Sequence, residues 1–353
     1  MHSFVELSDV HGNRYGQLVP LDADFSFNLN DEDSFTFDVS RDHRLASIAY
    51  LEPYATDFAW FVHDEVNDVN VCLMEGMVTA VAGEEESSFS VAGLSWEHYL
   101  NRRRYPFNPA NPTQYFYAAV NKDVFTIVED ILETVQSLSD SLILNFDNGT
   151  SGILRNLRIE PGDTETVLEI VGQLAEQKPS FDFAIIPQTR EFKMYNGKKG
   201  TEKSIRLAKG QNVSRIGFND EGIEGNSVLV SGAGSSVKLM KLREDTQSMN
   251  KYRRLDFDKD YGDVIDQNYL TSLAEADIVR GIAKEYGLSV DVTPKYAEYV
   301  LLNLEIGDTV SVIGDIDYTN LTVDDKFRIT GISGSMSRQR NFSVNLTFND
   351  DSV

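Results

Sequence analysis

The sequence predicts an α+β protein that consists mainly of β-strands. Short runs with an apolar residue at every second position fill the first and last thirds of the chain, and a helical spacing of apolar residues is confined to a few segments. A period of two forms one row on each face of a sheet, whereas spacings of three and four form a stripe along a helix. No longer unit repeats along the chain, so a solenoid is not expected.

The first segment, residues 1–105, contains several predicted strands. SFTFDVS places Phe35, Phe37 and Val39 on one face, and FSFNLN repeats the pattern. Turns rich in Asp, Asn and Gly separate these runs, which is typical of an antiparallel barrel or sandwich. The segment ends in SWEHYLNRRRYPF, which predicts a short helix followed by an exit at a proline.

Residues 106–215 predict a mixed α+β segment that begins with a polar linker, NPANPTQYFYA. One helix is predicted by five apolar residues spaced by four, three, four and three: Val124, Val128, Ile131, Val135 and Leu138. GDTETVLEIVGQLAEQK predicts a second helix, with Asp163 and Thr164 as candidate N-caps. FDFAIIPQTREFKMYNG then predicts a hairpin around a Pro-Gln-Thr-Arg turn.

Residues 216–353 return to strands, with one packed helix at about 270–286 and Gly287 as its expected stop. The strands are predicted in NSVLVSGAG, SVKLMKL, VDVTP, LLNLEIGDTVSVIG, KFRITGISGSMSRQ and NFSVNLTFND, and DFDKDYGDVID is predicted as a polar loop. The inward face of the helix is predicted to consist of Leu270, Leu273, Ala274, Ile278 and Ile282. An Asp at position 278 is expected to unfold this segment.

The composition excludes several classes of protein. The 353 residues carry 32 basic and 56 acidic side chains, a net charge of −24, which opposes general binding to DNA or to anionic membranes. A single cysteine, Cys72, excludes an intrachain disulfide and a cysteine-rich metal site. No N-terminal signal segment is recognisable, and no apolar run reaches the roughly 20 residues that cross a bilayer.

The sequence lacks several motifs that are typical of catalytic and ligand-binding sites. The five histidines, at positions 2, 11, 43, 63 and 98, form no zinc-binding pair, and there is neither a Gly-x-Ser-x-Gly elbow nor a Walker loop. SGAGSS lacks the third glycine of a dinucleotide loop, and DIDYTNLTVDD lacks the glycine at the sixth position of a calcium loop. We therefore predict no catalytic, cofactor-binding or metal-binding residues, no cofactor and no enzymatic activity.

Two basic stretches stand out against the acidic composition. NRRRY, residues 101–105, could meet an acidic partner or a phosphate, or it could be solvated or paired with nearby acids. The other stretch could dock an acidic neighbouring subunit or form a solvated loop; its basic residues are Lys193, Lys198, Lys199, Lys203, Arg206, Lys209 and Arg215.

The order of elements resembles that of a known family. GLSWEHYLNRR closes a strand-rich segment, and an α+β insertion follows before NSVLVSG, the YGDVID loop, TSLAEADIVRGIAKEYG, LNLEIGDTVSV and FRITGISGSMS. This order resembles the tail hub or baseplate hub proteins of tailed phages, including the hub-like minor tail proteins of siphophages. The resemblance implies two small tube-type β-barrels, in residues 1–105 and 216–353. In LNLEIGDTVSV, Gly307 can take a positive φ and Asp308 can bond the turn backbone.

The same resemblance implies a structural role in the virion. Three subunits would present six barrels as a ring at the distal end of the tail, adapting the sixfold tube to a threefold tip and leaving a channel for DNA exit. The implied partners are further copies as a homotrimer, the tail tube or distal tail protein, the tape measure protein, and tail tip or fibre proteins. The expected location is the tail tip, after synthesis in the host cytoplasm. Because the chain ends at NLTFNDDSV, cell-wall cleavage and receptor binding are expected in other chains.

Two other functions fit parts of the sequence. The aromatic stretch NPTQYFYAAV would suit a carbohydrate-binding or adhesion protein on the tail. The many Asp and Glu residues could include a carboxylate pair for hydrolysis of cell-wall glycan, although the sequence provides no spacing that selects one pair.

Overall fold

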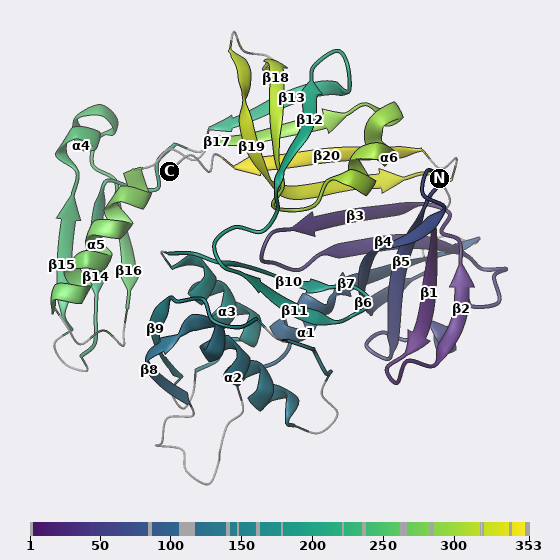
Figure 1. The fold of residues 1–353 in the computed structure, drawn as a ribbon, viewed down its shortest axis with the longest axis horizontal. Helices are drawn as coiled ribbons and strands as arrows, with labels where there is room; N and C mark the ends of the chain where they lie inside the picture. The colour runs from purple at the N-terminus through teal and green to yellow at the C-terminus, as the bar shows by residue number, and fades with distance from the viewer. Residues whose placement is uncertain are drawn as a thin grey trace. The chain divides into compact units, whose positions relative to one another are not determined.

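The computed structural model describes most of the chain as two compact units (Figure 1). Unit 1 comprises Met1–Ile216 and Val290–Phe348, and unit 2 comprises Gly217–Ser289 and Asn349–Val353. The described residues are 3–83, 87–105, 117–138, 142–146, 148–159, 163–177, 179–220, 222–234, 238–261, 264, 267–282, 286–317, 319, 321–338 and 341–349. The three-part division at residues 105 and 215 stays a prediction.

A 13-stranded sheet dominates the described residues, and it confirms the α+β, mainly β class. Its order is β13-β17-β20-β19-β3-β4-β7-β6-β5-β1-β2, and β18 adds β12 to the side of β19. The strands from the first segment are β1 Ser3–Asp9, β2 Arg14–Leu18, β3 Ala23–Asn28, β4 Ser34–Ser40, β5 Thr56–Asp64, β6 Val69–Ala82 and β7 Ser88–Ser95, with the short helix η1 Ile48–Tyr50 between β4 and β5. The remaining strands are β12 Glu202–Ala208, β13 Val213–Asp220, β17 Tyr286–Val292, β18 Thr309–Asp315, β19 Thr322–Met336 and β20 Phe342–Asn349.

The two closed barrels predicted from the sequence are not found in this sheet. Among the described residues the path of paired strands does not return on itself. The reason lies in β19, whose first half pairs with β18 and whose second half pairs with β3. Because β19 is long enough to pair first with β18 and then with β3, it joins the first and last segments of the chain into one sheet.

Aromatic side chains form the core beneath the first strands. The ring of Trp60 lies 4.6 Å from that of Phe35 and 5.1 Å from that of Phe25. Phe35, Phe37 and Val39 are all buried, which confirms the face predicted from their alternation. The Trp60 indole N–H donates to the hydroxyl of Ser3 at 2.7 Å, so the buried ring keeps its hydrogen bond.

Helices and short strands follow in the middle of the chain. They are α1 Trp96–Asn101, β8 Tyr117–Asp123, α2 Val124–Gln136, β9 Leu154–Ile159, α3 Val167–Glu176, β10 Asp182–Ile186 and β11 Glu191–Tyr195. The predicted stripe of α2 is buried up to Val135, whereas Leu138 lies beyond the helix end and is 40% exposed. The predicted hairpin is confirmed by the antiparallel pairing of β10 with β11.

The N-cap of α3 differs from the sequence prediction. Asp163 and Thr164 were the candidates, but Thr166 is the N-cap and forms a capping box with Glu169. The Thr166 hydroxyl accepts the Glu169 N–H at 3.2 Å, and the Glu169 carboxylate accepts the Thr166 N–H at 2.6 Å. Only Thr166 has a glutamate three residues later, which is the residue that a capping box requires.

Helix α6, Pro294–Asn303, was not predicted from the sequence. Its last residues, Leu301–Asn303, were assigned to a strand because their apolar run continues into the alternation of EIGDTVSV. Pro294 at the first helical position is the signal that could have marked the helix, since proline is favoured there.

The described part of unit 2 contains a three-stranded sheet, ordered β15-β14-β16, and the helices α4 and α5. The elements are β14 Ser227–Ser231, β15 Met240–Glu244, α4 Thr246–Tyr252, β16 Asp256–Asp260 and α5 Gln267–Ile282. DFDKD was predicted as a loop but forms β16, because parallel pairing with β14 supplies backbone partners to a segment that lacks a buried row. Gly287 belongs to β17 and does not stop the helix.

The inward face of α5 follows the prediction. Leu270 and Ala274 are fully buried, and Leu273 and Ile278 are half-buried against Val228 and Val230 of β14. The buried Asp277 lies on the same side and accepts the Tyr261 hydroxyl at 3.0 Å. None of the helices in the described residues is both long and apolar enough to span a membrane.

Replacing Ile278 with Asp is expected to destabilise unit 2 by about 2 kcal/mol, because a carboxylate would be placed against its small apolar core. Faster hydrogen exchange at 227–231 and 267–282 would report this loss. The matched control is Val279→Asp, one residue away and 57% exposed, which should exchange like the wild type. Equal protection in the two variants would contradict the assignment of the helix face.

Candidate functional site

The corner formed by Glu305, Ile306, Gly307 and Asp308 lies at the centre of the candidate site. Gly307 has a φ of +95°, as the sequence predicted for this turn. Asp308 is 2% exposed, and its carboxylate accepts the Glu305 N–H at 2.9 Å and the Thr201 N–H at 2.8 Å. One aspartate therefore closes the turn and ties it to the chain that enters β12.

A buried ion pair lies beneath this corner. Arg328 of β19 is 7% exposed and pairs with Asp182 of β10. The Arg328 guanidinium also donates to the carbonyl oxygens of Gly307, at 3.2 Å, and Lys199, at 3.1 Å. Asp182 further accepts the Asn30 amide at 3.1 Å. This polar cluster connects β19, the β10–β11 hairpin and the turn after β3.

The outer edge of β10 is held by side chains of the first segment. The Phe183 N–H donates to Asn30 at 2.8 Å, and the Ile185 N–H donates to Glu97 at 2.8 Å. Just after the strand, the Gln188 N–H donates to Glu75 at 2.6 Å. An edge strand with free N–H groups can pair with another chain, so these acceptors also block that edge.

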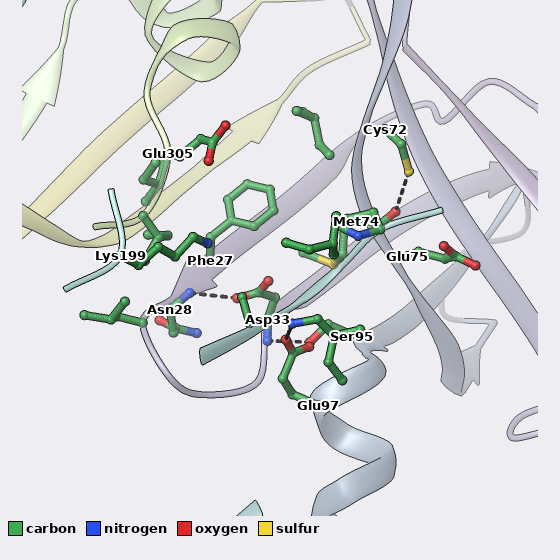
Figure 2. A pocket seen from close by; sticks show the side chains of 18 of the residues that line it. Phe27, Asn28, Asp33, Cys72, Met74, Glu75, Ser95, Glu97, Lys199 and Glu305 are labelled. Atoms are coloured by element: carbon green, nitrogen blue, oxygen red, sulfur yellow. Dashed lines mark hydrogen bonds between the residues drawn. The ribbon is translucent and has the colours of Figure 1, made fainter. Parts of the chain in front are cut away.

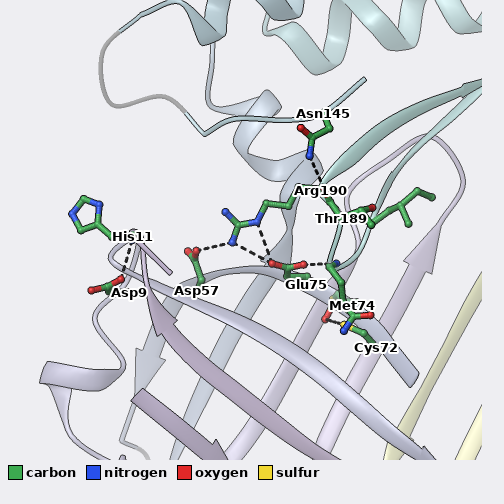
Figure 3. A network of polar contacts seen from close by, with 11 residues as sticks. Asp9, His11, Asp57, Cys72, Met74, Glu75, Asn145, Thr189 and Arg190 are labelled. Atoms are coloured by element: carbon green, nitrogen blue, oxygen red, sulfur yellow. Dashed lines mark hydrogen bonds and ion pairs between the residues drawn. The ribbon is translucent and has the colours of Figure 1, made fainter. Parts of the chain in front are cut away.

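Arg190, in the turn of the same hairpin, holds the β10–β11 hairpin against β5 and β6 (Figure 3). Its guanidinium lies 3.3 Å from the Asp57 carboxylate, 3.2 Å from the Glu75 carboxylate and 4.5 Å from the centre of the Trp96 ring. Burial raises the pKa of Asp57 to about 7, and Arg190, which Glu75 shares, offsets this effect only in part.

The raised pKa of Asp57 predicts a loss of stability with rising pH. Between about pH 4 and about pH 7 the folded chain holds a proton on Asp57 that the unfolded chain releases. The free energy of unfolding should therefore fall through this window, with a contribution on the order of 1–3 kcal/mol from Asp57. Asp57→Asn, which cannot ionise, should flatten the decline when urea unfolding is compared at pH 4 and pH 8. An unchanged slope in this variant would contradict the role of Asp57.

A cavity of about 590 Å³ lies beside these contacts in unit 1 (Figure 2). Its walls include Phe27, Met74 and Ile185, and its polar groups include Asp33, Glu97 and Lys199. The Asp33 carboxylate accepts the Asn28 N–H at 2.8 Å, and the Asp33 N–H donates to the Ser95 hydroxyl at 2.9 Å.

Burial and the negative charge of Glu97 raise the pKa of Asp33 well above its usual range. Burial also raises the pKa of Glu97, and hydrogen bonds from Ser95 and from the Ile185 N–H offset part of that effect. The cavity therefore places the carboxyl groups of Asp33 and Glu97 and the side-chain nitrogen of Lys199 between apolar walls. These groups can receive a polar side chain or hold the surrounding strands together.

The cysteine and the described histidines considered in the sequence analysis do not form a common site. Cys72 lines the cavity, but burial raises its pKa to about 12, so its thiol is protonated. His63 lies against Asn70, and His98 lies 3.0 Å from Glu32. Within the described residues, no group of three or more His, Cys, Asp or Glu side chains could hold a metal ion.

The other sequence candidates have structural roles in the described chain. Asp317, of the calcium-like stretch, pairs with Lys209 at 2.7 Å, and Lys203 lies 3.3 Å from Asp308. Ser231 ends β14, and in the described part of the chain β15 is the next element, as expected of a turn between strands. In the aromatic stretch, Tyr117 donates to Asp130 at 2.6 Å, and residues 111–116 lie outside the described residues.

The sequence analysis did not identify the buried charges Arg328, Asp182 and Glu97 or the half-buried Arg190. For Arg328 one signal was available in the sequence. It lies in FRIT, within a predicted strand, and a residue of a strand faces either the core or the solvent. Its partner Asp182 is 146 residues away, and no local pattern connects the two.

No protein-family model matches the sequence, and no curated protein sequence matches it either. Solved structures do match the fold. A tail protein from Neisseria meningitidis MC58 has a TM-score of 0.63 and 17% identity, and the match covers 100% of this chain and 98% of that one.

Two further structures extend the comparison. A 43 kDa tail protein of prophage MuSo2 from Shewanella oneidensis has a TM-score of 0.66 and 13% identity, with 98% of each chain covered. An E. coli component of the type VI secretion system, described as structurally similar to T4 bacteriophage tail proteins, has a TM-score of 0.50 and 14% identity; the match covers 93% of this chain and 73% of that one. The chain therefore has the fold of phage and prophage tail proteins, which this secretion component shares.

Proposed function

We propose that this chain is a structural protein of a phage-type tail, where it forms a ring at the distal end. The observation that carries the proposal is the likeness to the Neisseria tail protein over 100% of this chain and 98% of that chain. A shared fold over both full lengths supports a shared mode of assembly more strongly than a match to one domain would.

The ring is proposed to be a homotrimer that adapts a sixfold tail tube to a threefold tip. Its neighbours would be the tail tube or distal tail protein, the tape measure protein, and tip or fibre proteins. A rigid subunit suits this role, and the contacts of Arg328, Arg190 and Glu97 give unit 1 that rigidity because they join segments distant in sequence. Oligomers of this kind close through repeated contacts between identical subunits.

The acidic composition is proposed to serve DNA exit. If part of the charge of −24 lines the central channel, like charges would keep DNA from binding to the wall. A map of the ring with a neutral or basic channel would contradict this part of the proposal.

The role is proposed to be non-enzymatic. Two of the acids beside the cavity already have structural partners: Glu75 binds Arg190 and the Gln188 N–H, and Glu97 accepts the Ile185 N–H. A catalytic carboxylate needs a free oxygen directed at the substrate.

A cryo-electron microscopy map of tail particles containing this chain tests the proposal. The expected result is three copies in a ring at the distal end of the tube, with a continuous channel. Sedimentation equilibrium of the purified chain gives a supporting measurement, for which a trimer is expected. Particles in which the chain occupies any position other than a distal ring would overturn the proposal.

A further inference from the structure

One face of the unit 2 sheet combines a column of carboxylates with exposed apolar side chains. The strand pairings place Leu242, Leu229 and Asp258 in one row across the sheet. The same register places Met240 in the row of Asp260, and Asp256 at the other end of the carboxylate column. We call this surface the acidic face; its residues are Leu229, Met240, Leu242, Asp256, Asp258 and Asp260.

Helix α5 covers the opposite face of the sheet, where Val228 and Val230 are fully buried. On the acidic face, by contrast, Met240 is 54% exposed and Leu242 is 47% exposed. Asp256 and Asp260 bind Arg254 and Lys238 of the same unit, each at 2.8 Å. Asp258, between them, has no hydrogen bond or ion pair with the described residues, so the centre of the column is free to bind a cation.

Unit 1 carries a surface of the opposite charge immediately after α1. Arg102 and Arg104 are exposed, and neither forms an ion pair with the described residues although the chain holds 56 acids. The Arg102 guanidinium lies 5.9 Å from the centre of the Tyr54 ring. We call Tyr54, Arg102 and Arg104 the arginine patch.

Tyr54 is held in an unusual conformation. It is 52% exposed and has a φ of +62°, which bulky residues rarely adopt. A hydrogen bond of 2.7 Å from its N–H to the Val78 carbonyl fixes this backbone, and its ring stacks on His98 at 6.4 Å. The fold thus positions a large aromatic ring at the surface beside Arg102, and Tyr and Arg are among the residues most enriched at binding hot spots.

We propose that the arginine patch of one copy binds the acidic face of a second copy, a contact that rests on the ring proposed above. The planar guanidinium of Arg102 or Arg104 can donate two parallel hydrogen bonds to the carboxylate of Asp258, which is the bidentate geometry that arginine favours. The Tyr54 ring would cover Leu242 and Met240.

The choice of a second copy follows from charge. Two copies each carry −24 and repel one another, and a contact that joins a local cationic surface to an acidic one offsets this repulsion. The arginine patch and the acidic face are different surfaces of the same chain. The contact is therefore head-to-tail, which is the kind that can close a ring.

Cross-linking between two single-cysteine variants tests the contact. Both carry Cys72→Ser; one adds Pro53→Cys, next to Tyr54, and the other adds Glu244→Cys, an exposed position on the same sheet face as Asp258, so that the charged residues of the contact stay in place. A short bismaleimide linker should join an equimolar mixture into a heterodimer, several-fold more than in a mixture where Arg338→Cys replaces Pro53→Cys. Arg338 is the matched control, because it is an exposed arginine of unit 1 that is paired with Asp22. Equal yields at every concentration up to the solubility limit would overturn the contact.

Charge reversal provides the second arm. Adding Arg102→Glu and Arg104→Glu to the Pro53→Cys variant should abolish its cross-link to the Glu244→Cys variant, and adding Asp256→Lys and Asp258→Lys to the Glu244→Cys variant should restore it. Failure of this restoration would also overturn the contact. The tail map tests the ring independently of the cross-link. If the map shows a distal ring but the cross-link fails, the proposed function is supported and this contact is wrong. If the cross-link forms but the map shows no distal ring, the contact is supported and the proposed function is wrong.

Discussion

Arg328→Met is expected to lower the free energy of unfolding by about 3–5 kcal/mol, because it leaves Asp182 buried without its counter-charge. Methionine has a similar volume, so the loss comes from the charge and from the carbonyls of Gly307 and Lys199 that lose a donor. Urea unfolding at pH 7, followed by tryptophan fluorescence, measures the effect.

Lys326→Met is the matched control, two residues away on the same strand. Lys326 is 55% exposed and pairs with Glu202 at 2.5 Å, and such surface pairs contribute less than about 1 kcal/mol. Removing both buried charges, in Arg328→Met with Asp182→Leu, should recover part of the loss. Equal stability of Arg328→Met and Lys326→Met would show that the buried pair does not hold the junction together.

Gly307→Ala is expected to destabilise the chain by about 3 kcal/mol or more, because it combines a disfavoured φ with a backbone clash. A Cβ at position 307 would lie 2.5 Å from the carbonyl oxygen of Lys199. The opposite residue, Gly200, is equally close, since its Cβ would lie 2.2 Å from the carbonyl carbon of Gly307. The two segments of the chain can approach this closely only because neither Gly200 nor Gly307 has a side chain.

Gly210→Ala separates the two causes of that loss. Gly210 has a φ of +80° but open space where a Cβ would stand, so its substitution should cost only about 1 kcal/mol. Differential scanning calorimetry of both variants gives the comparison. If the two melting temperatures fall by the same amount, the close approach at Gly307 has no energetic role.

Several elements could be predicted from the sequence because their signals are local. The alternation of Phe35, Phe37 and Val39 gave the buried face of β4, and the stripe from Val124 to Val135 gave the buried face of α2. The turn at Gly307 and Asp308 was predicted in the same way, since φ freedom and a short polar side chain act within a few residues. The mainly β class follows from such patterns taken together.

Only the tertiary structure decided where the charges and the sheet neighbours lie. Arg328 finds Asp182, and Arg190 finds Asp57 and Glu75, across separations of 146, 133 and 115 residues. The length of β19 joins two strand-rich segments that were predicted to close separately. The physical reason is that the periodicity of apolar residues indicates only which side of a helix or strand is buried. The partner of a buried charge, or the neighbour of a strand edge, depends on which distant segment packs beside it in the folded chain.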